Sequence, residues 1–124
     1  MKALVIDDDD IARELIVSVL ENGGYETFDL PSPIGATQVI IDRGIDIVVL
    51  DLFMPAMSGD KLARMLRSNA RLASLTIVLV SSCDIEQLQG LATSVKANAV
   101  VPKHEIRTRL LPALNGLFRR AAAR

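Results

Sequence analysis

The chain has 124 residues, half of them hydrophobic, which is enough for the core of one compact domain and too little for two. Its formal net charge of −1 lacks the positive excess of nucleic-acid-binding proteins, so no direct contact with nucleic acid is expected. The single cysteine excludes an internal disulfide, and no apolar run is long enough to cross a membrane, so we expect a cytoplasmic protein without membrane contact.

Short apolar runs alternate with helical patterns from the first residues onward. The runs predict five strands, at residues 3–6, 25–28, 47–50, 76–80 and 99–101. Residues 47–50 form the most β-branched run and are expected at the centre of a sheet, whereas the half-polar residues 25–28 are expected nearer its edge.

Between the strands, apolar residues recur at the three- and four-residue spacing of helices that pack on one face. These apolar faces contain Ala12, Leu15, Ile16, Val19 and Leu20, then Ala36, Val39 and Ile40, then Leu62, Met65 and Leu66, then Ile85, Leu88, Leu91 and Val95, and last Leu110, Leu114, Leu117 and Phe118. Gly23 or Gly24 is expected to end the first helix, and Asp84 to cap the fourth.

The last helix contains Pro112, which would cost roughly 3 kcal/mol in a helix interior. With Thr108 as the N-cap, Pro112 would fall at the end of the first turn, where backbone N–H groups lack helical partners. We therefore expect this helix to start late or to bend.

Strand and helix alternate five times, which predicts a mostly parallel sheet with helices on both faces. In open sheets of this kind the functional crevice lies beyond the carboxyl ends of the strands. The residues that directly follow each strand are the four aspartates at 7–10, then Asp51, Ser81 and Lys103. Asp9 or Asp10 is expected to be only the N-cap of the first helix.

The remaining acidic groups would meet at one edge of the sheet and repel one another. Carboxylates crowded together without a cation raise one another's pKa values and destabilise a fold. A hard divalent ion removes that conflict, and Mg²⁺, or Mn²⁺ in its place, takes oxygen ligands of this kind. Magnesium beside Asp51, a hydroxyl and a lysine is suited to phosphoryl transfer, with Asp51 as the nucleophile that forms an acyl phosphate. Ser81 and Lys103 would then contact phosphoryl oxygens.

These motifs resemble the receiver domain of two-component response regulators over essentially the whole chain. The stretch "VIDDDDIARELI" is similar to the family's first strand with its acidic pair, here Asp7 and Asp8. The segment "VVLDLFMPAMSGDKLARMLR" resembles the phosphoacceptor segment, and "IVLVSS" resembles the strand that ends in the switch hydroxyl, with Lys103 following at the family's spacing.

The resemblance implies a flavodoxin-like (βα)5 fold with strand order 2-1-3-4-5 and a single receiver domain over residues 1–124, which could be trimmed from a longer protein. It also implies that Asp8, Asp51 and the backbone carbonyl of Phe53 bind the metal directly and that Asp7 acts through a water. A histidine kinase or phosphotransfer protein would phosphorylate Asp51, and the response would pass to a downstream protein or output domain.

Three positions depart from the family pattern in the region that commonly carries the output. His104 follows Lys103 where proline with a cis bond is usual, so a trans bond and a different loop path are expected. Val100 replaces a common aromatic residue, and Lys96 stands where glycine commonly ends the fourth helix. His104 could serve as a base, but an exposed loop histidine is the favoured interpretation.

Phe53 and Cys83 lie two residues beyond Asp51 and Ser81, at positions that flank the path of the hydrolytic water in this family. Neither side chain acts there as a polar acid or base, so slow loss of the phosphoryl group is expected.

Other functions remain open on the sequence alone. An interaction module that no longer uses phosphorylation could share this fold, and the altered output region favours it slightly. A phosphohydrolase would need a second acid where Phe53 stands, and a flavin-binding protein would not place four aspartates in its phosphate loop. Residues 96–124 carry seven basic side chains and one acidic one, so the last helix is either a solvated basic surface or a contact for an acidic partner or a second copy.

Overall fold

The computed structural model describes residues 1–82 and 85–122. Its strands are β1 (Lys2–Ile6), β2 (Glu26–Leu30), β3 (Ile47–Asp51), β4 (Thr76–Ser81) and β5 (Ala99–Pro102). Its α-helices are α1 (Asp10–Asn22), α2 (Ala36–Arg43), α3 (Gly59–Ser68), α4 (Ile85–Val95) and α5 (Ile106–Ala122). Short 3₁₀ turns at Ala70–Leu72 and Lys103–Glu105 precede β4 and α5. The alternation of strands and helices is the predicted one.

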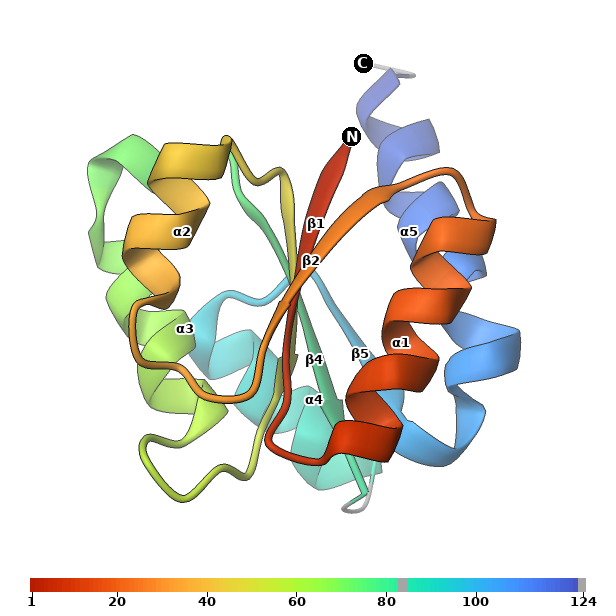
Figure 1. The fold of residues 1–124 in the computed structure, drawn as a ribbon, viewed down its shortest axis with the longest axis horizontal. Helices are drawn as coiled ribbons and strands as arrows, with labels where there is room; N and C mark the ends of the chain where they lie inside the picture. Colours follow the sequence, from red (N-terminus) through yellow and green to blue (C-terminus); the bar gives the residue numbers. More distant parts are fainter. Residues whose placement is uncertain (83–84, 123–124) are drawn as a thin grey trace.

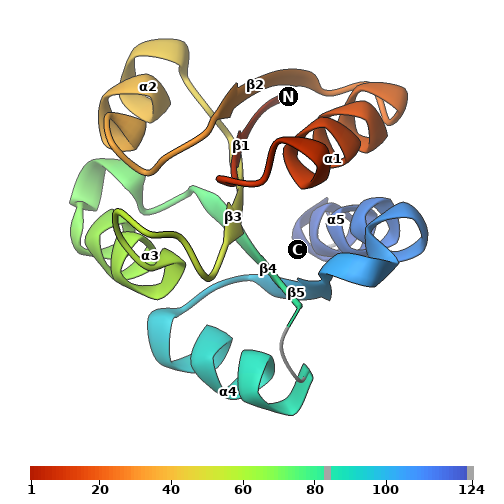
Figure 2. The same cartoon turned by 60° about the horizontal axis from the view of Figure 1, so that its bottom comes forward.

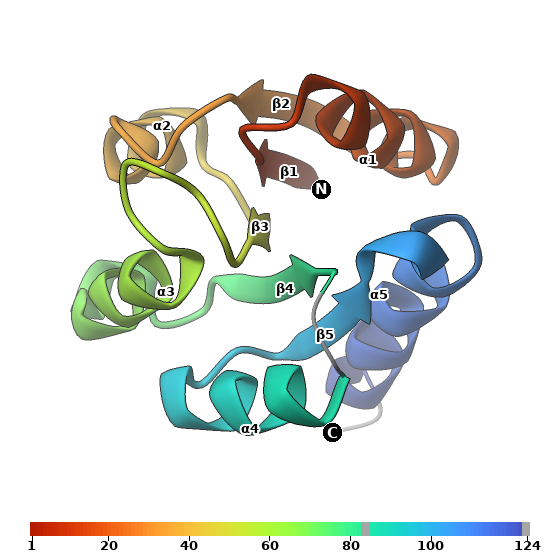
Figure 3. The same ribbon diagram turned by 90° about the horizontal axis from the view of Figure 1, so that it is seen from below.

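All five strands are parallel and lie in the order β2-β1-β3-β4-β5, which confirms the predicted fold class (Figures 1 and 3). Every residue of β3 is buried, as expected for a strand with neighbours on both sides and helices above and below. Strand β2, at the edge of the sheet, has only exposed and half-buried residues. The register sets Asp51 beside Val80 and Ser81 beside Pro102, so the strand ends meet along one edge.

Each face of the sheet has its own hydrophobic core, since successive side chains of a strand point to opposite faces. Helices α1 and α5 cover one face, where Ile16, Leu20, Leu110 and Leu114 pack on the odd-numbered side chains of β1 and β3. Helices α2, α3 and α4 cover the other face (Figure 2). No helix within the described ranges is long and apolar enough to span a membrane.

Helix α3 buries Leu62 and Leu66 as expected, but Met65 is 52% exposed. The buried side chains are Leu62, Ala63 and Leu66. At about 100° per residue these three lie within one arc, whereas Met65 falls well outside it. The prediction of Met65 as a core residue was wrong, since a small alanine provides the third contact with the sheet.

The predicted start of the last helix was also wrong. Helix α5 begins at Ile106, directly after a 3₁₀ turn, and the Thr108 hydroxyl donates to the carbonyl of Glu105 at 3.3 Å instead of capping a helix start. Pro112 therefore lies inside the helix, where it cannot donate to the Thr108 carbonyl. The expected cap at Asp84 lies outside the described residues.

The turn between α4 and β5 is held by one guanidinium. Arg67, near the end of α3, donates to the carbonyls of Leu75 and Lys96 at 2.7 and 2.9 Å and to Oδ1 of Asn98 at 2.6 Å. The same Asn98 oxygen accepts from the N–H of Ile77, at 2.8 Å. Lys96 has a φ of 59°, the left-handed conformation in which glycine is common. Its own backbone carbonyl is one of the three atoms that Arg67 fixes.

Gly59 brings the start of α3 against the end of β3. Its N–H donates to the carbonyl of Leu52 at 2.7 Å. A Cβ at this position would collide with the backbone oxygen of Asp51 and lie 2.9 Å from the Cα of Leu52. No side chain can relieve that contact, because both obstacles belong to the backbone.

We expect Gly59→Ala to destabilise the protein by about 1–3 kcal/mol, since the helix must move away from the strand that carries Asp51. Urea unfolding measures the change. Gly90→Ala is the matched control, because Gly90 lies inside α4 with open space around the position of its Cβ. The control should be as stable as the wild type or more stable by up to about 1 kcal/mol. Equal effects of the two substitutions would contradict the proposed close contact.

Candidate functional site

The buried polar and charged side chains of the described residues gather at one place. They are Asp7 and Ser81, both fully buried, and Asp51, which is 3% exposed. Each lies at or just beyond the carboxyl end of a strand, so parallel pairing brings them to the same edge of the sheet. Burying a charged or polar group is costly unless partners are provided. The site is therefore the one place in the described core where that cost is accepted.

The backbone and the carboxylate of Asp7 both contact neighbouring residues. Its backbone N–H donates to the carbonyl of Leu30 at 3.2 Å, and its Oδ1 accepts from the N–H of Asp9 at 2.9 Å. Its Oδ2 lies 3.0 Å from Nζ of Lys103, and this ion pair is the polar contact found for that buried oxygen in the described part of the chain. Asp9 accepts from Ile11 and Ala12 N–H groups, which confirms it as the cap of α1.

Asp51 shares the same lysine. Its Oδ2 lies 3.4 Å from Nζ of Lys103, and its Oδ1 accepts a long hydrogen bond of 3.5 Å from the N–H of Phe53. Burial, together with the charge of Asp7, raises the pKa of Asp51 to about 6. Lys103 and the N–H of Phe53 oppose this increase without cancelling it. Asp51 is thus a carboxylate whose ionised form is poorly compensated.

Lys103 is the cation between the two buried acids. Burial by itself would lower its pKa, but hydrogen bonds and charges from Asp7 and Asp51 outweigh that effect and raise the pKa. One ammonium group therefore faces two buried carboxylates. The site retains an excess of negative charge whenever both acids are ionised.

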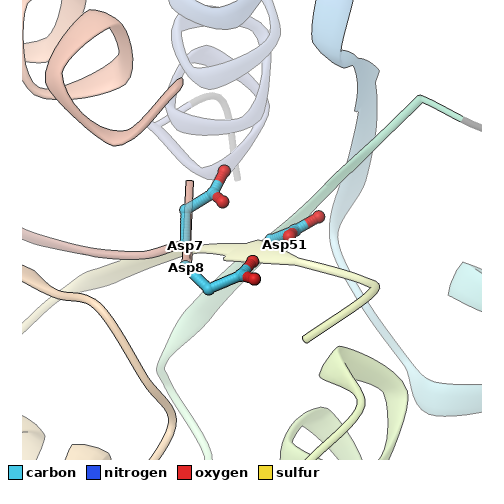
Figure 4. A group of neighbouring side chains, drawn as sticks. All are labelled: Asp7, Asp8 and Asp51. Atoms are coloured by element: carbon cyan, nitrogen blue, oxygen red, sulfur yellow. The ribbon is translucent and has the colours of Figure 1, made fainter. Parts of the chain in front are cut away.

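A third carboxylate, Asp8, completes a group of oxygen donors. One oxygen from each of Asp7, Asp8 and Asp51 lies within 4.8 Å of the others (Figure 4). Asp8 is exposed, and its carboxylate makes no hydrogen bond or ion pair with the residues that the structure describes. Three carboxylate oxygens with excess negative charge fit a hard divalent cation such as Mg²⁺. The predicted meeting of residues 7, 8, 51 and 103 at one edge agrees with this geometry.

The other predicted residues lie around this group. Ser81 is the last residue of β4 and is buried, beside Pro102 and one position from Lys103 in the parallel register. The Phe53 side chain is 63% exposed, and its backbone is the part that contacts Asp51. Cys83, the second residue predicted to flank the hydrolytic water, lies outside the described residues.

The structure also describes the three positions that depart from the family pattern. No cis peptide bond occurs in residues 1–82 and 85–122, so the Lys103–His104 bond is trans, as predicted. His104 is exposed in the 3₁₀ turn, and Val100 packs half-buried against the core of α2, α3 and α4. The structure places Arg13 beside the site, and the sequence analysis did not identify it. Its spacing of three from Asp10, typical of a helix ion pair, was the available signal.

Comparison with known proteins gives one consistent result. The family model for the response regulator receiver domain matches residues 3–115. The phosphate regulon transcriptional regulatory protein PhoB of Pseudomonas aeruginosa is 32% identical over 119 residues, which cover 94% of this chain and 51% of that protein. Response regulator MprA of Mycobacterium sp. (strain KMS) is 29% identical and is covered to 52%. The chain thus spans about half the length of the curated relatives it matches.

Solved structures agree with the sequence comparison. The BeF3-activated N-terminal receiver domain of Klebsiella pneumoniae RstA has a TM-score of 0.82 and 27% identity, covering 93% of this chain and 96% of that one. The chemotaxis protein CheY4 of Vibrio cholerae has a TM-score of 0.78 at 18% identity and covers 96% of both chains, which supports the fold alone.

We expect the metal-free protein to lose stability as the pH rises from about 4 to about 6, across the raised pKa of Asp51. In that interval the folded state holds a proton that the unfolded state releases, so ionisation favours unfolding. Asp51→Asn should remove this slope and raise the free energy of unfolding at pH 7 by on the order of 2 kcal/mol. Urea unfolding in EDTA at several pH values measures both effects.

The matched control is Asp42→Asn, an exposed aspartate of α2 whose carboxylate accepts a hydrogen bond from Gln38. It should keep the wild-type dependence of stability on pH. If Asp51→Asn is less stable than the wild type in EDTA at pH 7, the excess negative charge at Asp51 does not destabilise the metal-free protein and the interpretation is wrong.

Proposed function

Since the chain belongs to the family of response regulator receiver domains, we propose that it accepts a phosphoryl group on Asp51 from a histidine kinase or a phosphotransfer protein. The observation that carries this proposal is the buried Asp51 carboxylate, poorly neutralised and within 3.4 Å of the Lys103 amine. Asp7 and Asp8 supply further negative charge that a divalent cation would balance. Signalling through a phosphorylated aspartate is the use that best accounts for this costly arrangement.

In the proposed reaction an oxygen of Asp51 attacks the phosphorus of a phosphohistidine. The new O–P bond forms as the N–P bond breaks, and the histidine nitrogen leaves with the electron pair. The product is an acyl phosphate. Lys103 would pair with one phosphoryl oxygen, and the Ser81 hydroxyl would donate to another. This positioning is most of what the protein must supply, because phosphoryl transfer needs little covalent assistance.

Asp8, Asp51 and the backbone carbonyl of Phe53 would hold Mg²⁺, or Mn²⁺ in its place, and Asp7 would act through a water. The bound cation supplies positive charge that neutralises the carboxylates and the incoming phosphoryl group. Asp7 suits the indirect role, because its Oδ1 already accepts from the N–H of Asp9 and its Oδ2 already forms an ion pair with Lys103. Asp8 suits a direct one, because its carboxylate is exposed and makes no polar contact in the described ranges.

Phosphorylation would act as a switch with a downstream reader. Added charge at Asp51 would draw the Ser81 hydroxyl inward and shift a pre-existing equilibrium between two conformations. We propose that the chain is one receiver domain over residues 1–124 that works in the cytoplasm and signals to a downstream protein or an output domain. The basic last helix is the proposed contact for an acidic partner or a second copy, without direct contact to nucleic acid.

A second candidate function is a protein-interaction module that does not use phosphorylation. Val100 favours it, because a half-buried valine has no ring to turn inward when Ser81 moves. The left-handed Lys96 and the exposed His104 change the same region. The intact set of acidic and basic residues around Asp51 favours the phosphorylated switch over this alternative.

We expect the protein to gain the mass of one phosphoryl group when it is incubated with acetyl phosphate and Mg²⁺. Mass spectrometry of the intact protein measures the gain, and peptide mapping locates it at Asp51. Asp51→Asn should gain none, whereas Asp42→Asn should react as the wild type does. The gain should be absent in EDTA. No modification of the wild type by small phosphodonors would favour the interaction module.

We expect the acyl phosphate to be long-lived, because the exposed ring of Phe53 offers no hydrogen bond to an attacking water. Phe53→Asn should shorten its half-life several-fold, because its amide can orient the water; this is less than the roughly 10²- to 10⁴-fold contribution of a true general acid or base. Loss of the phosphoryl group is followed by mass spectrometry after removal of the donor. Phe53→Leu, which keeps an apolar side chain, is the control. A longer half-life in Phe53→Asn than in wild type contradicts the shielding.

A further inference from the structure

Arg13 makes three contacts with three separate parts of the chain. Its NH1 donates to the backbone carbonyl of Asp7 at 2.8 Å, its NH2 to Asp10 at 2.6 Å and its Nε to Asp29 at 2.8 Å. The side chain is only 14% exposed. These contacts join the end of β1, the first turn of α1 and the edge strand β2. The planar fork of the guanidinium carries five N–H donors in fixed directions on three nitrogens, which lets it reach all three partners at once, whereas the donors of an ammonium group share one nitrogen.

The contact with Asp7 fixes the backbone at the start of the acidic loop. The Asp7 N–H is bound to the Leu30 carbonyl of β2, and its own carbonyl is bound to Arg13, so both sides of this residue are tied. Two residues later, Asp9 is fixed by its N–H bond to Asp7 and by capping α1. Asp8 therefore lies between two immobilised residues. The direction of its carboxylate depends on the backbone that Arg13 holds.

We propose that Arg13 is a positioning residue for the acidic loop of residues 7–9. By fixing this loop, Arg13 holds Asp8 at the distance from Asp51 that a divalent cation requires. This inference rests on the proposed function, because it assumes that the three carboxylates bind a cation. Arg13 does not touch the cation in this assignment. It acts through the Asp7 carbonyl, as groups behind a metal ligand commonly do.

Electrostatics alone makes the opposite prediction, which allows a clear test. A positive charge near a cation site repels the cation, so its removal should strengthen metal binding. The positive charge of Arg13 is already balanced by Asp10 and Asp29, which also hold its pKa above the ordinary value. If geometry is the contribution of Arg13, its removal should weaken metal binding although the site becomes more negative.

The experiment measures the dissociation constant for Mg²⁺ by isothermal titration calorimetry, well below the unfolding temperature of each variant. Arg13→Gln removes the charge and the fork, and Arg13→Lys keeps the charge but loses the fork. We expect both to bind Mg²⁺ about 10- to 100-fold more weakly than the wild type. Arg64→Gln is the matched control, because Arg64 pairs with Asp60 on the exposed surface of α3. Its affinity should change by less than about twofold, as expected for a screened surface charge.

A second measurement follows the backbone directly. Amide exchange at Asp7 and Asp9 should become faster in Arg13→Lys, whereas exchange at Val49 and Val78, in the middle of the sheet, should not change. Equal or tighter Mg²⁺ binding by Arg13→Gln, or unchanged binding by Arg13→Lys, would overturn the assignment. Failure of both variants to fold would make Arg13 a purely stabilising residue and would overturn it as well. If the wild type binds no Mg²⁺, the proposed metal site itself fails, which is a different result from failure of the variants alone.

Discussion

One lysine facing two buried carboxylates is the interaction on which the rest of the site depends. Lys103 lies 3.0 Å from Asp7 and 3.4 Å from Asp51, and a single positive charge cannot neutralise both. A protein interior tolerates a balanced ion pair poorly and an unbalanced cluster even less. The domain nevertheless builds its sheet so that the strand ends force these groups together. The remaining negative charge favours binding of a divalent cation at this edge of the sheet.

Parallel topology explains how so few residues can build the site. Neighbouring strands end at one edge, so residues at or just beyond the ends of β1, β3 and β5 become neighbours although they are far apart in sequence. The helices on both faces then make the sheet rigid, and Gly59 lets α3 start against the backbone of Asp51. The chemistry thus depends on packing behind the acids as well as on the acids themselves. Arg13 extends the same logic to the first loop, where it joins three elements around the Asp7 carbonyl.

Much of this architecture could be predicted from the sequence, because hydrophobic periodicity and strand-end residues are local signals. The central position of β3 and a helix cap at one of the residues Asp9 and Asp10 follow from these signals. The strand order was instead implied by the resemblance to receiver domains, and the structure has that order. Met65 did not follow the prediction, since a three-residue spacing cannot show whether alanine or methionine faces the sheet. The start of α5 was missed because a 3₁₀ turn leaves no hydrophobic pattern.

Contacts between distant segments were the hardest to predict. The three partners of Arg13 come from the loop after β1, from α1 and from β2, and only the pair with Asp10 has a spacing that a sequence displays. The raised pKa of Asp51 likewise depends on burial, which the sequence gives only on average. These features arise from the assembled fold, so they become visible only when the elements are placed together.

The guanidinium that holds the turn after α4 has a mechanical consequence. Arg67 ties the Lys96 carbonyl and Asn98 to the Leu75 carbonyl in the segment that leads into β4, so the far end of α4 is anchored to the framework. A helix fixed at one end cannot slide along the sheet. Any movement of α4 that keeps these three hydrogen bonds must leave the end near Lys96 in place and displace the opposite end of the helix. The turn after α4 would then be the pivot of that movement.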